Sequence, residues 1–182
     1  TVIYKLNESG KFQGKIEVTF IFRQKDEIKD FDKYQLLSPE VQDTAIIDFS
    51  FIDQQRYFIP EGDYEMEIII ADLNADKKPF SAIQPISIDF DETGLCFSGI
   101  QLIKSFSPAT EQNITTKGGF DLIPMVDNFY PESLNKLTYY TEIYNSDKTI
   151  GASEKFLVTC MIKSFETGNA LKDFVSYKKF DA

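Results

Sequence analysis

The segment IPEGDYEMEIIIADLNADKKPF, residues 59–80, decides the fold that we predict for this chain. Pro60 fixes its own φ angle and Gly62 tolerates the positive φ of a tight turn, so the segment begins with a turn. Strict alternation follows, in which Tyr64 begins an apolar face and Glu65 begins a solvated face. The polar stretch DLNADKKP then supplies residues that favour a second turn. The segment therefore predicts one arm of an antiparallel β-hairpin.

The partner strand of this hairpin is predicted in FSAIQPISIDF, which begins at Phe80. Because proline has no backbone N–H to donate to a neighbouring strand, Pro85 predicts an edge strand or a bulge. The same period-two alternation predicts strands in GKIEVTFIFRQ, LCFSGIQLIKSF and EKFLVTCMIKSFETGNALKDF, the last with a turn around 167–169. It also marks DTAIIDFSFID, where Ile47, Phe49 and Phe51 share one side. DEIKDFDKYQLLSP allows either the end of a strand or a short helical turn.

These patterns predict an all-β protein made of two tandem immunoglobulin-like antiparallel β-sandwich units. Aromatic residues make up 14% of the chain and are spread along it, and no long stretch has helical periodicity. The apolar pattern stops at DFDETG, so we place a first domain at 1–90 and a second at 95–182. Since the second has about five predicted strands against the usual seven or so, we expect it to be an incomplete sandwich.

Composition excludes several classes of function. The formal net charge of −10 disfavours nucleic acid as a partner, because an acidic surface repels phosphate. The chain has no histidine, which rules out a Ser-His-Asp site and a histidine-containing zinc site. No motif indicates a cofactor or a metal, and no apolar run is long enough for direct membrane insertion. We expect Cys96 and Cys160 to be buried free thiols, with a bridge between two strands as the alternative.

Asp72-x-Asn74-x-Asp76 has the spacing of the first half of a calcium loop. However, Lys77 stands where such a loop needs glycine, and Ile83 stands where it needs a bidentate glutamate. We therefore predict a β-turn here and no calcium site.

The stretch YYTEIYN, residues 139–145, carries the candidate ligand or partner surface, Tyr139, Tyr140 and Tyr144. If it is one strand, Tyr140 and Tyr144 share a face with Glu142, and Tyr139 lies on the other. Exposed tyrosines bind sugars by stacking or bind another protein, whereas buried ones fill a core. All of these alternatives stay open. Glu142 has no second carboxylate in view for glycoside hydrolysis, so we assign no catalytic residue.

Three short patterns match modification sites, although such patterns are frequent by chance. Asn7-Glu8-Ser9 and Asn113-Ile114-Thr115 match the acceptor pattern for N-glycosylation. Asp43-Thr44-Ala45 resembles the O-glycosylation sequence that Bacteroidetes use on exported proteins.

The order of these stretches resembles the exported GWxTD-domain proteins of Bacteroidetes. The segment at 59–80 is similar to the family pattern of Pro-x-Gly-x-Tyr followed by Asp-Leu-Asn, which closes an N-terminal β domain. GIQLIKS, DLIPMVDNFYP and LTYYTEIYN follow in the family's order, so the resemblance covers roughly 12–147. The Gly-Trp-x-Thr-Asp motif itself is absent, and the chain contains no tryptophan.

The resemblance implies export to the periplasm or cell surface and a non-catalytic role, and it carries over no catalytic residues. The chain does not begin with methionine, so we expect an export signal to have been removed. We therefore predict a structural or protein-interaction module of the cell envelope whose partner is another protein or the rest of its own chain. The alternatives are a carbohydrate-binding or adhesin-like module that binds a glycan, and an accessory β domain of a larger enzyme.

Overall fold

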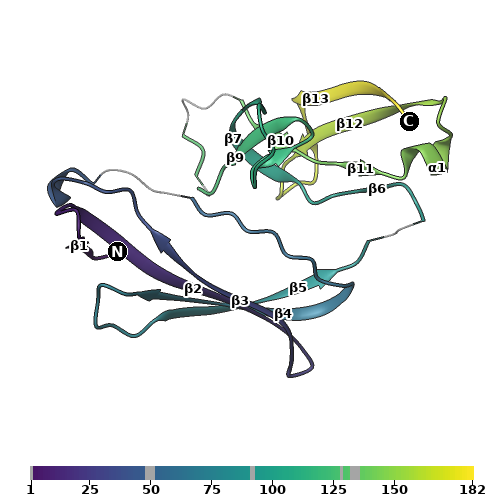
Figure 1. The fold of residues 1–182 in the computed structure, drawn as a ribbon. Helices are drawn as coiled ribbons and strands as arrows, with labels where there is room; N and C mark the ends of the chain where they lie inside the picture. Colours follow the sequence, from purple (N-terminus) through teal and green to yellow (C-terminus); the bar gives the residue numbers. More distant parts are fainter. Residues whose placement is uncertain (1, 48–51, 91–92, 128, 132–135) are drawn as a thin grey trace. The chain divides into compact units, whose positions relative to one another are not determined.

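The protein is nearly all β, and every strand pairing is antiparallel, as the sequence predicts (Figure 1). The computed structural model describes residues 2–47, 52–90, 93–127, 129–131 and 136–182. Helix in these residues is limited to a 3₁₀ turn, η1 (Thr44–Ile46), and one short helix, α1 (Ser146–Ile150). The chain divides into two compact units, Thr1–Asp89 and Phe90–Ala182.

The first unit is built on one antiparallel sheet with β2 at its centre. β4 lies along one edge of β2, and β5 completes that side. Along the other edge, β1 pairs with the start of β2 and β3 pairs with the rest. The hairpin predicted from residues 59–80 is β4–β5, and Pro85 lies in the edge strand β5, which confirms both predictions. The strands are β1 (Tyr4–Leu6), β2 (Phe12–Gln24), β3 (Glu27–Leu37), β4 (Gly62–Asp72) and β5 (Phe80–Ile88).

The two faces of this sheet differ in character. On one face the pairing register sets Val18 beside Ile70, and Val18 is buried. On the other face, ion pairs join neighbouring strands: Arg23 to Glu67 at 2.6 Å and Lys33 to Glu17 at 2.8 Å. These exposed or half-exposed pairs contribute little to stability, so burial of the apolar face carries most of the stabilisation.

A tyrosine fixes the entry into β4. The Tyr64 hydroxyl donates to the Pro60 carbonyl oxygen at 2.9 Å, and Tyr64 is buried. Gly62, between them, has a φ of 142°, and a Cβ there would lie 2.7 Å from Nε2 of Gln24. A tyrosine bonded to backbone a few residues upstream is a hallmark of immunoglobulin-like sandwiches. The described residues of this unit form one sheet, so the immunoglobulin-like topology stays a prediction.

The segment 52–60 lies against the apolar face as a strap. Its Tyr57 ring packs against Phe20 and Phe22 of β2, with ring centroids 5.4 and 5.1 Å apart. Two reciprocal hydrogen bonds hold the strap to β3. The Tyr57 hydroxyl donates to Asp32 at 3.3 Å. The Tyr34 hydroxyl of β3 donates to Asp53 of the strap at 2.6 Å. We call these two hydrogen bonds the clasp. They hold the strap over Phe22, which is 2% exposed.

The described residues of the alternating run DTAIIDFSFID, 43–47 and 52–53, do not form the strand that its pattern predicts. Asp43 accepts a hydrogen bond from the Ala45 backbone N–H at 2.9 Å, and this cap begins the 3₁₀ turn η1. Residues 52–60, at the end of the run and beyond it, have no strand pairing. Phe49 and Phe51 lie outside the described residues. The open choice for DEIKDFDKYQLLSP resolves to a strand, β3.

The Asp72–Asn74 turn is structural, as predicted. Asp72 accepts hydrogen bonds from the backbone N–H groups of Asn74, at 2.9 Å, and of Ile3, at 2.7 Å. The Asn74 side chain donates to the Ile3 and Gln13 carbonyl oxygens, both at 2.9 Å. The turn therefore ties the beginning of the chain to β2. Within the described ranges, no group of three or more Asp, Glu or Cys side chains is placed to hold a metal.

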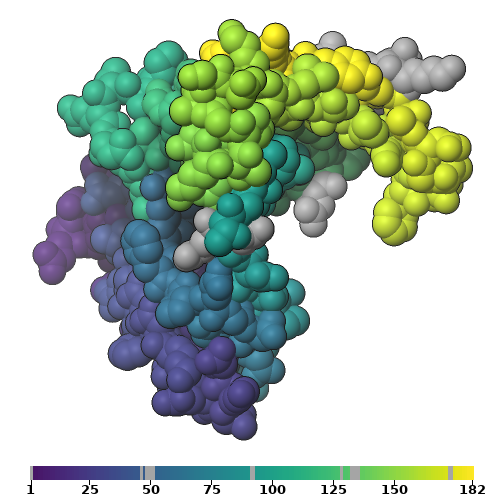
Figure 2. Space-filling view, turned by 90° about the vertical axis from the view of Figure 1, so that its right-hand side faces the viewer, coloured from purple at the N-terminus to yellow at the C-terminus, as the bar shows by residue number. Residues whose placement is uncertain are grey.

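The described residues of the second unit form three small sheets. β10, β7, β9 and β8 form a four-stranded sheet in that order, β11 pairs with β6, and β12 pairs with β13. The predicted hairpin with a turn near Gly168 is confirmed as β12–β13, and its tip projects in Figure 2. The strands are β6 (Cys96–Phe97), β7 (Gln101–Pro108), β8 (Thr116–Lys117), β9 (Phe120–Pro124), β10 (Thr138–Tyr140), β11 (Ile143–Tyr144), β12 (Lys155–Lys163) and β13 (Ala170–Asp181).

The clasp makes the stability of the first unit sensitive to alkali. Burial and the Asp32 carboxylate raise the pKa of Tyr57 from 10.0 to about 12. Burial and Asp53 also raise the pKa of Tyr34. Since both pKa values are higher in the folded state, the stabilisation is complete below pH 10 and is lost as the pH rises towards 12.

Urea unfolding monitored between pH 8 and pH 12 should show this loss as a steep fall in the free energy of unfolding. A Tyr34→Phe/Tyr57→Phe double variant should be less stable at pH 8 and should show a shallower fall. The matched Tyr4→Phe variant should behave like the unaltered protein. Equal pH dependence in the double variant and the unaltered protein would contradict the clasp.

Candidate functional site

The predicted tyrosine strand is interrupted, so its three tyrosines do not form one continuous strip. β10 ends at Tyr140 and pairs with β7, whereas β11 begins at Ile143 and pairs with β6. Between them, the Glu142 N–H donates to the Ser98 hydroxyl at 2.8 Å, and the Ser98 N–H donates to the Glu142 carbonyl at 2.9 Å. Thr141 also donates to the Ser98 carbonyl oxygen, at 3.2 Å. These contacts with one distant serine replace a regular ladder.

Tyr139 lines an apolar groove between β10 and the β12–β13 hairpin. The groove has a volume of about 760 Å³, and Leu102, Leu137, Val158 and Ile162 are among its lining residues. The Tyr139 side chain is 37% exposed. Roughly 300–1,000 Å³ is the usual size of a pocket for a small ligand or for a few side chains of a partner. The groove therefore has the size and the apolar lining of a binding site.

The two cysteines are free thiols and half-buried, in line with the expectation of free thiols, although we predicted full burial. Cys160 lines the groove. A hydrogen bond with the Cys160 thiol is the main cause that raises the pKa of Tyr139, and burial of Tyr139 is the second. Tyr139 is protonated at neutral pH with or without this shift, and an uncharged ring suits binding by packing.

Tyr140 and Tyr144 share one carboxylate. The Tyr140 hydroxyl donates to Oε1 of Glu142 at 2.7 Å, and the Tyr144 hydroxyl donates to Oε2. The Lys117 ammonium lies 5.8 Å from the Tyr140 ring centroid and donates to Gln101 at 3.0 Å. Glu142 raises the pKa of Tyr144 to about 12, chiefly through the hydrogen bond. These contacts hold both tyrosines in place.

A second cleft, of about 500 Å³, lies beside the groove and combines rings with charges. Tyr140 lines it together with Phe156 and Phe180, whose rings stack at 5.8 Å with an interplanar angle of 22°. The Lys178 ammonium lies 5.1 Å from the Phe180 ring centroid, and Asp181 also lines the cleft. The sequence analysis did not predict these four residues as part of a site. Alternation predicts that a segment forms a strand, but it does not predict which distant strand will lie beside that segment.

No protein-family model, curated protein or solved structure matches the chain. The resemblance to GWxTD-domain proteins therefore stays a prediction. No helix in the described ranges is long and apolar enough to cross a membrane.

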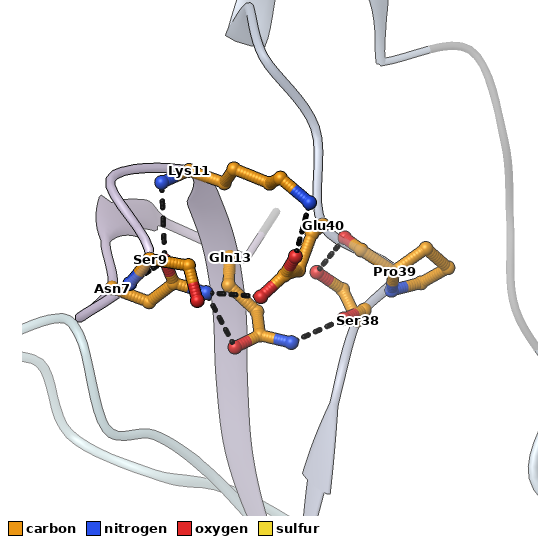
Figure 3. Close-up of polar contacts among 7 residues, drawn as sticks. All are labelled: Asn7, Ser9, Lys11, Gln13, Ser38, Pro39 and Glu40. Atoms are coloured by element: carbon orange, nitrogen blue, oxygen red, sulfur yellow. Dashed lines mark hydrogen bonds and ion pairs between the residues drawn. The ribbon is translucent and has the colours of Figure 1, made fainter.

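Asn7, the first possible glycosylation acceptor, has a structural role (Figure 3). Its side-chain nitrogen donates to Glu40 at 2.6 Å and to Gln13 at 3.4 Å. Its side-chain oxygen accepts from the backbone N–H groups of Ser9 at 3.0 Å and Lys11 at 3.1 Å. Because a sugar on the nitrogen would displace one of these bonds, the folded state favours unmodified Asn7.

Asn113, the second possible acceptor, is also engaged. Its nitrogen donates to Asp121 at 2.9 Å, and its oxygen accepts from the Thr115 N–H at 2.8 Å and hydroxyl at 2.7 Å. Asp121 also accepts a hydrogen bond from the buried Thr116 hydroxyl at 2.6 Å. This network shapes the loop that leads into β8.

A Glu142→Gln substitution tests the shared carboxylate. A neutral amide removes the charge that opposes ionisation of Tyr144, so the pKa of Tyr144 should fall from about 12 towards 10.0. Ultraviolet titration of tyrosine ionisation measures this pKa, and a Tyr144→Phe variant assigns the signal. The matched control is Glu111→Gln, which should leave the titration unchanged. A pKa of Tyr144 that stays near 12 in Glu142→Gln would show that the carboxylate is not its cause.

Proposed function

We propose that this chain is a non-catalytic interaction module of an exported bacterial cell-envelope protein. We place its binding site at the groove beside Tyr139, where an extended segment of a protein partner, or of the rest of its own chain, would lie. The groove is the observation that carries the proposal, because apolar side chains line it from both sides. The family resemblance supports export and a cell-envelope role.

The strands around the groove suit an extended segment. β12 and β13 pair only with each other among the described residues, so each has one edge without a strand partner. An extended peptide binds such an edge through backbone hydrogen bonds, while pockets for alternate side chains give specificity. The alternate residues Phe156, Val158, Cys160 and Ile162 are half-buried, whereas the side chains between them are exposed.

The polar groups near the groove favour binding over catalysis. Both carboxylate oxygens of Glu142 accept hydrogen bonds from tyrosines, and the chain has no histidine to act as a base. In this environment Glu142 positions rings and does not move protons.

Selection of short linear peptides displayed on phage tests the groove directly. Peptides that bind should carry alternating apolar residues. Tyr139→Ala should weaken their binding by about tenfold or more, because a tyrosine at the centre of an interface often contributes strongly to affinity. The matched control is Tyr177→Ala, since Tyr177 lies on the outward face of the same hairpin and is 67% exposed. It should change affinity by less than about twofold. Failure to select peptides, or equal losses in both variants, would contradict the proposal.

A second candidate function is carbohydrate binding, which the cleft lined by Phe156, Phe180, Lys178 and Asp181 favours. Its stacked rings offer apolar surface to a sugar face, and its charged groups can bond to hydroxyls. A glycan array should then show binding that Phe180→Ala removes and Tyr177→Ala keeps. An array without binding would eliminate this function.

A further inference from the structure

A third cavity in the same unit is built around an irregularity in β7. Ile103 of β7 pairs with Pro124 of β9, and Ser105 pairs with Ile123, so Lys104 is an extra residue between two consecutive pairs. Such a bulge redirects a side chain, and bulges occur more often than average beside binding sites. Lys104 is exposed and lines a cavity of about 840 Å³.

The cavity gathers two cations and an apolar wall. Lys136 joins Lys104 in the lining, and neither lysine forms an ion pair with a described carboxylate. Ile103, Met125 and Phe129 supply apolar surface. Asp127 also lines the cavity, so the described lining residues keep one excess positive charge in a chain whose net charge is −10. A local positive charge in an acidic protein attracts an anion against the overall field.

Tyr130 adds a hydrogen-bond donor that no described residue accepts from. The Tyr130 hydroxyl is buried and has no hydrogen-bond partner in the part of the chain that the structure describes. A buried hydroxyl without a partner costs free energy, so each such group needs an explanation. Tyr130 lines the cavity that Lys104 and Lys136 line. A ligand that accepts its hydrogen bond would remove this cost.

We infer that this cavity binds a small organic anion with an apolar body. The anionic group, a carboxylate, phosphate or sulfonate, contacts Lys104 and Lys136 and accepts the hydrogen bond of Tyr130. The apolar body packs on Met125 and Phe129. Thr138 of β10 faces this cavity, whereas its neighbours Leu137 and Tyr139 face the groove. Lys136 lines both the cavity and the groove, so the two sites adjoin at this residue, whereas Lys104, Tyr130, Met125 and Phe129 line the cavity alone. The inference rests on the residues that line the cavity alone and does not depend on the proposed function.

Binding of 8-anilinonaphthalene-1-sulfonate to the full chain tests the inference, with uncharged N-phenyl-1-naphthylamine as the matched probe. Lys104→Gln should weaken binding of the sulfonate about tenfold, which is the usual effect of losing a charged hydrogen-bond partner. The same variant should change binding of the uncharged probe by less than about twofold. Lys148→Gln, in α1 and away from the cavity, should change neither. Competition by octanoate and by octyl phosphate identifies which anionic group is preferred.

Tyr130→Phe provides a second readout that a merely structural tyrosine would not give. Because it removes an unsatisfied buried hydroxyl, it should raise the melting temperature without ligand, and it should weaken sulfonate binding at the same time. The inference is wrong if Lys104→Gln lowers the affinity of both probes equally, or of neither. It is also wrong if Tyr139→Ala abolishes sulfonate binding, because the groove would then be the site.

Discussion

The contact of Tyr57 with Phe20 and Phe22 is the interaction on which the first unit depends. Alternation along β2 gathers apolar side chains on one face of the sheet, and that face must be covered for the unit to be stable. The strap provides part of this cover, because its tyrosine packs on the two phenylalanine rings, and no second sheet is present among the described residues of the unit. Polar groups then fix the register of the strap, since each of two tyrosine hydroxyls finds an aspartate on the opposite segment.

Alternation and turn residues predicted the hairpins, because each hairpin is specified by residues within one segment of the chain. The β4–β5 hairpin follows from its turn residues and its alternation, and the place of β5 at the edge follows from Pro85. The β12–β13 hairpin follows in the same way. In each case the residues that specify the structure are close together in the sequence, so one segment carries the whole signal.

The prediction failed where a distant residue or a cap decides the structure. Ser98 interrupts the tyrosine strand through bonds to Glu142, more than forty residues away. Asp43 converts the start of an alternating run into a 3₁₀ turn by capping it. The bulge at Lys104 depends on the register between two strands, which no single segment encodes. The candidate binding surfaces share this property, because each combines strands from separate parts of the sequence.

Burial of the apolar face, together with strand partners on both edges, makes β2 the most stable strand of the first unit. Amide hydrogen exchange measured residue by residue tests this. We expect the slowest exchange of the first unit in β2 and faster exchange at the outward-facing amides of β5. Exchange in β2 as fast as at the free edge of β5 would contradict it.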